Sequence, residues 1–162
     1  MSATKTKIGL TRSLPADIEA RMSELFSVTL NAADRALNRD QLAALMQSHD
    51  VLVPTLTDKI DSELIAQAGP QLKLIANFGT GTDNIDIDAA YAKGITVTNT
   101  PSVLTEDTAD MTMALILSVP RRLGEGEKLI RSGQWDGWKP SGMLGHRVNG
   151  KTLGIVGMGR IG

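Results

Sequence analysis

Short apolar runs alternate with stretches of helical periodicity along the first hundred residues, and this alternation limits the possible folds most strongly. The apolar runs are too short for helices and are typical of buried strands. Strands joined by helices at this spacing pair in parallel, so we predict an α/β protein whose sheet is covered by helices on both faces. The predicted strands are residues 7–10, 27–30, 51–53, 72–76 and 95–98.

The helices between these strands are marked by residues that favour helix ends. Asp40, Asp61 and Asp86 are predicted N-terminal caps, because a carboxylate can accept hydrogen bonds from the free N–H groups of a first turn. Gly69-Pro70 and Gly94 are the predicted stops. These signals complete a repeated strand–helix pattern.

The pattern changes after residue 98. Thr105 is predicted to cap a long helix, because Glu106 and Asp107 load its first turn with the negative charge that the helix dipole favours. A second helix is predicted at about residues 125–132. We therefore place one domain at residues 1–100 and the start of a second at 101–162.

The end of the chain has two further features. Residues 134–150 have no periodicity but contain two tryptophans, which predicts an ordered arm. Residues 152–157 are apolar and predict a new strand.

Composition and charge exclude several classes of protein. Seventeen basic and eighteen acidic residues give a net charge of −1, so no basic surplus favours nucleic acid or a membrane surface. The absence of cysteine excludes disulfides and thiolate chemistry, and no group of His, Asp and Glu has metal-site spacing. No apolar run reaches the roughly 20 residues of a membrane span. Met1–Lys7 is not followed by the apolar segment of a secretory signal, so we expect a cytoplasmic protein.

The final residues, 157–162, have the form G-x-G-x-x-G directly after the predicted strand. In such a turn Gly157 permits the bend, Gly159 lets backbone approach a pyrophosphate, and Gly162 allows a following helix to pack closely. The motif predicts a dinucleotide-binding turn. A glycine-rich strand end is the alternative.

The loop at residues 77–86, NFGTGTDNID, follows the fourth predicted strand. Ligands of open α/β sheets bind at this carboxyl end of the strands. Two glycines around Thr80 can free the backbone to present adjacent N–H groups to a carboxylate or phosphate. The alternative is a turn whose Asp83, Asn84 and Asp86 only cap the next helix.

Several segments together resemble the NAD(P)-dependent D-2-hydroxyacid dehydrogenase family in order and spacing. They are the loop at 77–86, NTPSVLTEDTAD at 99–110 and GKTLGIVGMGRIG at 150–162. The segment SGQWDGWKP at 132–140 is most similar to the glyoxylate/hydroxypyruvate reductase branch. The resemblance covers nearly the whole chain.

The resemblance implies a flavodoxin-like parallel-sheet substrate domain followed by the start of a Rossmann domain. It implies that the backbone N–H groups of Thr80 and Gly81 bind the substrate carboxylate. Trp138 matches an arm residue that reaches into the partner subunit's active site, which implies a homodimer. The implied contacts with the cofactor, NADP or NAD, are Thr105, Gly157, Gly159, Arg160, Ile161 and Gly162.

The implied reaction is reduction of glyoxylate, hydroxypyruvate or a related 2-oxo acid to the D-2-hydroxy acid. The family's catalytic arginine, acidic residue and histidine lie beyond the glycine turn, so this chain has no catalytic residue and is expected to be inactive alone. His49 and His146 do not match the family's catalytic position, and we expect structural or solvent-facing roles for them. Leu104 stands where related formate dehydrogenases have an asparagine, which argues against formate as substrate.

Two other hypotheses stay open. The chain can be a non-enzymatic flavodoxin-like module that binds a carboxylate or mediates dimerisation, or the family's substrate here can be phosphoglycerate or lactate. The dehydrogenase hypothesis also expects Thr80 and Gly81 to face the same crevice as the turn that begins at Gly157.

Overall fold

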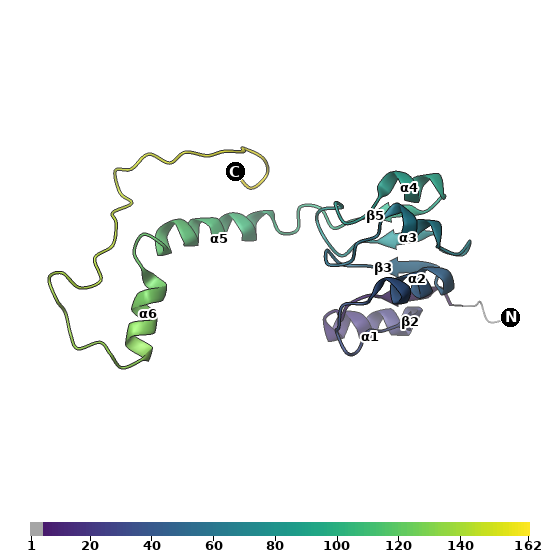
Figure 1. Ribbon diagram of the computed structural model, residues 1–162, viewed down its shortest axis with the longest axis horizontal. Coiled ribbons are helices and arrows are strands. Elements are labelled where there is room, and N and C mark those ends of the chain that lie inside the picture. Colours follow the sequence, from purple (N-terminus) through teal and green to yellow (C-terminus); the bar gives the residue numbers. More distant parts are fainter. Residues whose placement is uncertain (1–4) are drawn as a thin grey trace. The chain divides into compact units, whose positions relative to one another are not determined.

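Five parallel strands form one sheet in the order β2-β1-β3-β4-β5 (Figure 1). The computed structural model describes residues 5–162, so the segment Met1–Lys7 lies partly outside it. The strand order is that of flavodoxin-like folds, and the predicted α/β class is confirmed. Each strand lies within two residues of its predicted bounds. The strands are β1 (Lys7–Leu10), β2 (Ser27–Thr29), β3 (Val51–Val53), β4 (Leu74–Ala76) and β5 (Thr96–Thr98).

Helices connect successive strands of this sheet. Parallel crossovers are right-handed, so the step from β1 to β2 puts its helix on one face and the steps in the opposite direction put theirs on the other. The helix α1 therefore lies on one face, while α2, α3 and α4 share the other. The helices are α1 (Ala16–Leu25), α2 (Arg39–Ser48), α3 (Ser62–Ala66) and α4 (Ile87–Ala92).

The caps of these helices agree only in part with the sequence prediction. Asp61 and Asp86 accept a backbone hydrogen bond from the first turns of α3 and α4, as predicted. Asp40 is not a cap. The helix α2 begins at Arg39, so its N-cap is Asn38, two residues before Asp40, and Asn38 and Gln41 exchange side-chain-to-backbone bonds of 2.9 Å there. This capping box satisfies two backbone groups at once, which a lone Asp40 cannot do.

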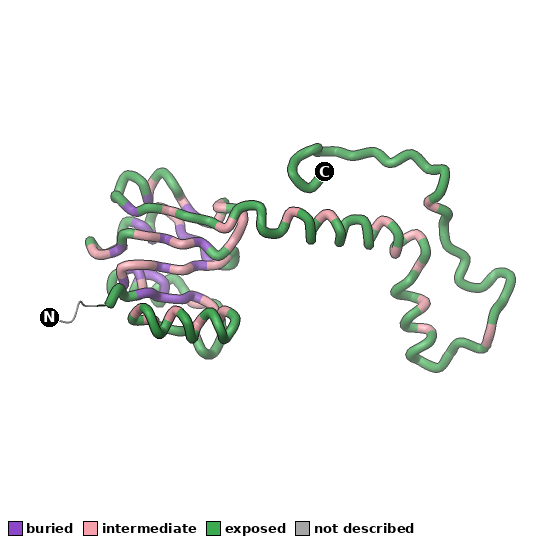
Figure 2. Tube along the Cα trace, turned by 180° about the vertical axis from the view of Figure 1, so that it is seen from behind, coloured by how far each residue is buried: buried purple, intermediate pink, exposed green. Residues whose placement is uncertain are grey.

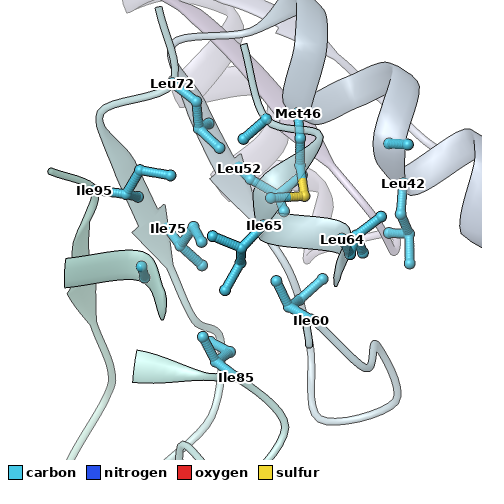
Figure 3. Packing of buried hydrophobic residues seen from close by; sticks show 13 residues of the cluster. Leu42, Met46, Leu52, Ile60, Leu64, Ile65, Leu72, Ile75, Ile85 and Ile95 are labelled. Atoms are coloured by element: carbon cyan, nitrogen blue, oxygen red, sulfur yellow. The ribbon is translucent and has the colours of Figure 1, made fainter. Parts of the chain in front are cut away.

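The core lies between the sheet and the helices α2, α3 and α4 (Figure 3). Leu52 of β3 and Ile75 of β4 point into it and are fully buried. On the opposite face, α1 contacts β2, while Val53 and Ala76 are only half-buried. Among helices α1–α4, only α1 lies on that face. Helices thus lie on both faces, as predicted, but α1 covers its face only in part: Ile8 and Leu10 of β1 are buried there, while Val53 and Ala76 are not.

The chain divides into two compact units, of which the first ends at Ser102 and the second begins at Val103. The second contains α5 (Thr105–Ser118) and α6 (Leu123–Arg131). None of its residues is buried, whereas the first unit holds all the buried residues of the described chain (Figure 2). Within residues 5–162, no helix combines the length and apolar character needed to cross a membrane.

Two predictions for the second unit are wrong. Residues 152–157 form no strand, because a strand needs a hydrogen-bonded neighbour and the described sheet ends at β5. Thr105 does not cap α5. It is the first residue of the helix, and the N-cap position is Leu104, which makes no side-chain capping bond. Glu106 and Asp107 do lie in the first turn, as predicted.

Candidate functional site

The carboxyl ends of the parallel strands meet at one edge of the sheet, which is where α/β sheets bind ligands. Thr11 follows β1, Thr55 follows β3 and Asn77 follows β4. The loop at residues 77–86 starts at this edge. The fold therefore presents the predicted substrate loop where a ligand can reach backbone groups.

The loop holds the carbonyl oxygens of Thr80 and Gly81 by hydrogen bonds. Asn99 Nδ2 donates to the Thr80 carbonyl at 2.7 Å, and Asn77 Nδ2 donates to the Gly81 carbonyl at 2.9 Å. The Thr80 hydroxyl donates to the Thr100 carbonyl at 3.1 Å. Over residues 5–162, by contrast, the backbone N–H groups of Thr80 and Gly81 donate to no acceptor. Two adjacent free donors at a sheet edge can bind an anion.

The two glycines of this loop have a different role from the one their sequence suggests. Neither Gly79 nor Gly81 has a positive φ, so the loop is not built on left-handed backbone. A Cβ on Gly79 would lie 2.5 Å from Cδ2 of the exposed Leu56 side chain, which would have to move aside to admit it. Leu56 thus covers the backbone just before the two free N–H groups.

Sequence reasoning missed the polar side chains beneath this loop. Thr11, Asp58 and Asn77 are buried, and Asn84 is half-buried. They lie far apart in the chain, and only their positions after strands hinted at a common location. The alternative in which Asn84 only caps the next helix is wrong, because its amide bonds to other loops while the side chain of Asp86 caps α4.

Other polar residues near the sheet have structural partners. Arg12 donates to both carboxylate oxygens of Asp34, at 2.8 and 3.2 Å, and this guanidinium lowers the Asp34 pKa to about 2. His49 is buried against the Thr29 hydroxyl and the Leu45 carbonyl, at 2.8 and 3.1 Å, which is a structural role. Within the described chain, no three His, Asp or Glu residues gather as a metal site.

The glycine turn at the end of the chain is tight. Gly157 has a φ of +96°, which favours glycine, and a Cβ on Gly162 would lie 2.6 Å from the Gly157 carbonyl oxygen. No atom lies within 4 Å of the Cβ position of Gly159. The neighbouring Arg160 and Ile161 are exposed. The first and third glycines are therefore required by the turn itself, and the second leaves its backbone accessible.

The remaining predicted site residues also lie in the second unit. Trp138 is 82% exposed and lines a cavity of about 400 Å³ together with Trp135 and Met143. Thr105 is half-buried at the start of α5. Thr80 and Gly81 belong to the first unit, so the shared crevice expected for them and the turn at Gly157 stays a prediction.

Taken together, the strand order defines a flavodoxin-type α/β domain, and the loop at its ligand edge presents free backbone N–H groups, those of Thr80 and Gly81 among them. The family model for the catalytic domain of D-isomer specific 2-hydroxyacid dehydrogenases matches residues 9–155. The chain belongs to this family.

Relatives and solved structures agree with this assignment. The chain is 44% identical to a glyoxylate reductase from Thermococcus litoralis, over 98% of this chain and 49% of the relative. A structure from Polaromonas sp. JS6 66, assigned to the same family, superposes with a TM-score of 0.89 at 39% identity, over 97% of this chain and 49% of that one. The structure of an NADPH-dependent glyoxylate/hydroxypyruvate reductase from Sinorhizobium meliloti, bound to NADP and malonate, superposes with a TM-score of 0.77 at 32% identity. The match covers 98% of this chain and 48% of that one. The chain spans about half the length of the curated relatives it matches.

Proposed function

We propose that the protein containing this chain reduces glyoxylate, hydroxypyruvate or a closely related 2-oxo acid to the D-2-hydroxy acid with NADPH or NADH. The observation that carries the proposal is the pair of free backbone N–H groups at Thr80 and Gly81, at the ligand edge of the sheet. Support comes from the family assignment and from relatives named glyoxylate reductase.

The chain's own contribution to this reaction is to bind and orient the substrate. Two neighbouring N–H donors bind the two oxygens of a carboxylate through charge-assisted hydrogen bonds. Because both donors belong to the backbone, the hold does not depend on the protonation of a side chain. A 2-oxo acid held in this way presents its carbonyl carbon in a defined position, which favours reaction.

The glycine turn fits a nicotinamide dinucleotide. A pyrophosphate needs close backbone approach, which the open Cβ position of Gly159 permits, and a tight bend, which the positive φ of Gly157 provides. The residues proposed to hold it are Thr105, Gly157, Gly159, Arg160, Ile161 and Gly162. When bound, the reduced dinucleotide supplies hydride to the carbonyl carbon.

The domain assignment and the assembly are part of the same proposal. Residues 1–100 are the substrate-binding part, and residues 101–162 begin the nucleotide-binding domain. Trp138 is proposed to complete the active site of a partner subunit in a homodimer, which fits the high exposure of its side chain. The protein is proposed to work in the cytoplasm.

The test is a substrate panel on the protein encoded by the whole reading frame that contains this chain. We expect NADPH or NADH absorbance to fall with glyoxylate and hydroxypyruvate, more than with pyruvate or phosphohydroxypyruvate. The purified 162-residue chain should show no turnover, since the family's proton donor is not in it. Turnover by this chain alone, or a preference for pyruvate or phosphohydroxypyruvate, would contradict the proposal. Binding of a carboxylate without any reductase activity would favour the non-enzymatic module.

A further inference from the structure

A buried polar cluster lies directly beneath the Thr80–Gly81 loop. Thr11 is fully buried, and Asp58 and Asn77 are 3% and 2% exposed. Burying polar groups is costly unless each finds a hydrogen-bond partner. The three residues follow three different strands, β1, β3 and β4, so the cluster joins separate segments of the ligand edge.

Asp58 anchors one side of this cluster. Its Oδ2 accepts a hydrogen bond from the Thr11 hydroxyl, from the Thr55 backbone N–H at 2.8 Å, and from the Thr55 hydroxyl at 3.3 Å. The carboxylate therefore ties the end of β1 to the loop after β3.

Asn77 and Asn84 form the other side. Their amides bond reciprocally, each Nδ2 donating to the other Oδ1 at 3.2 Å. Asn84 Nδ2 also donates to the backbone carbonyls of Thr55 and Asp58, at 3.1 and 3.2 Å. The second proton of Asn77 Nδ2 goes to the Gly81 carbonyl at 2.9 Å. A continuous set of hydrogen bonds thus runs from the loop after β3 to the carbonyl oxygen of Gly81.

This path ends on the residue whose N–H is free. The Gly81 carbonyl lies on the peptide that follows the Gly81 N–H, so fixing it restricts the backbone rotation of the residue that carries one of the two donors. The Thr80 carbonyl is fixed separately, by Asn99.

We propose that Asn77 and Asn84, supported by Asp58, are positioning residues that hold the N–H groups of Thr80 and Gly81 ready for the substrate carboxylate. The expected effect of these residues on the reaction rests on the proposed function. Their expected effect on the order of the loop is independent of it. Asn84 is the residue to test, because its side chain reaches three partners and touches neither donor.

The first experiment measures loop order in the ¹⁵N-labelled 162-residue chain by NMR relaxation. In the wild type, the amides of Thr80 and Gly81 should have order parameters near those of rigid backbone, about 0.85. The neutral variant Asn84→Ala should lower them below about 0.6 while the amides of β5 keep theirs. The control is Asn38→Ala, which removes the hydrogen bonds of a helix cap and adds no charge.

The second experiment measures kinetics of the protein from the whole reading frame. Asn84→Ala should raise KM for the 2-oxo acid by between about tenfold and a hundredfold, because small displacements of binding groups have effects of that size. The KM for the nucleotide should not change. Asn38→Ala should leave both KM values unchanged although it also lowers stability.

The outcomes separate this inference from the proposed function. If Asn84→Ala changes neither the order parameters nor the KM, or if Asn38→Ala changes them equally, the positioning role is wrong. If Asn84→Ala does not fold, Asn77→Ser is measured instead with the same criteria. If the wild-type protein reduces no 2-oxo acid, the proposed function fails. The order parameters still decide whether the side chains of Asn77 and Asn84 hold the loop in place.

Discussion

The two units of the chain both carry large apolar side chains on their helices but have different interiors. The first unit surrounds a core in which Leu52, Ile60 and Ile75 have no exposed surface. In the second, Leu115 and Leu117 of α5 are each 54% exposed. An α-helix satisfies its own backbone, so α5 and α6 form without a core, whereas strands need neighbours.

The polar contacts differ in the same way. In the first unit the pairs Arg12–Asp34 and Arg39–Asp61 join segments far apart in sequence. In the second, the pairs Arg122–Glu125, Glu127–Arg131 and Asp136–Lys139 join residues three or four positions apart. The comparison teaches that long-range ion pairs join segments of the first unit, whereas the long-range hydrogen bonds of the second connect Pro120 and Arg122 with His146 and Leu144.

The largest expected difference concerns buried apolar side chains. Ile75→Ala should destabilise the first unit by about 2–5 kcal/mol, because it leaves a cavity in the core. Leu115→Ala, at an exposed position, should change stability by no more than about 0.5 kcal/mol. Urea unfolding followed by circular dichroism measures both. Equal losses would mean that α5 is buried as deeply as the core.

A smaller effect is expected from a polar link between helices α3 and α4. Lys93 Nζ donates to the carbonyls of Ile65, Ala66 and Ala68, at 2.9, 2.5 and 2.8 Å. Lys93→Met should cost about 1–2 kcal/mol, since the last carbonyls of α3 lose a charged donor. The matched control is Lys73→Met, whose ammonium bonds to nothing in the described chain. An unchanged stability of Lys93→Met would contradict this prediction, because it would mean that water satisfies the three carbonyls as well as the ammonium does.

Helix caps provide a third contrast. Asn38→Ala removes the capping box of α2 and should lower stability by about 1 kcal/mol. Leu104→Asn introduces a cap at α5, where no side chain caps the helix, and should increase its helical signal. Helicity at 222 nm and the urea midpoint measure the two changes. An unchanged helical signal for Leu104→Asn would mean that another group already satisfies the first turn.

The smallest effect is a pH dependence specific to the first unit. Hydrogen bonds from Arg12 and Arg39 lower the pKa values of Asp34 and Asp61 from 3.8 to about 2. A lowered pKa in the folded state adds stability that is present above the ordinary pKa and is lost as pH falls towards 2. These pairs are exposed, so the effect should be small and weaken with salt.

The variant Asp34→Asn/Asp61→Asn checks this pH dependence. It should show a shallower loss of stability than the wild type between about pH 5 and pH 2. Asp88→Asn, at a carboxylate without an ion pair in the described chain, is the control. The prediction fails if the double variant and the wild type lose stability in parallel.

The fold of the first unit could be predicted because its signals are local. Short apolar runs and caps such as Asp61 specify strands and helices without knowledge of partners. Residues 152–157 carry an equally clear strand pattern, yet they form none, because a strand depends on a neighbour that sequence periodicity does not reveal. The cap at Asn38 depends on reciprocal bonds with Gln41, and the cap preference of a single residue does not distinguish Asn38 from Asp40.

The candidate site was less accessible to prediction. Its chemistry at Thr80 and Gly81 came from the family resemblance, because spacing alone left a simple turn equally open. The supporting residues Thr11 and Asp58 are isolated polar positions in unrelated segments, and only the folded sheet brings them under the loop. Burial of a carboxylate is a property of the fold and has no sequence signature.

The most direct test of the central claim is an NMR titration of the ¹⁵N-labelled chain with oxamate, an unreactive analogue of 2-oxo acids. Binding through the free donors predicts saturable shifts of the Thr80 and Gly81 amides that exceed those of all other residues. Shifts confined to other residues, or none at these two amides at saturating oxamate, would contradict the claim.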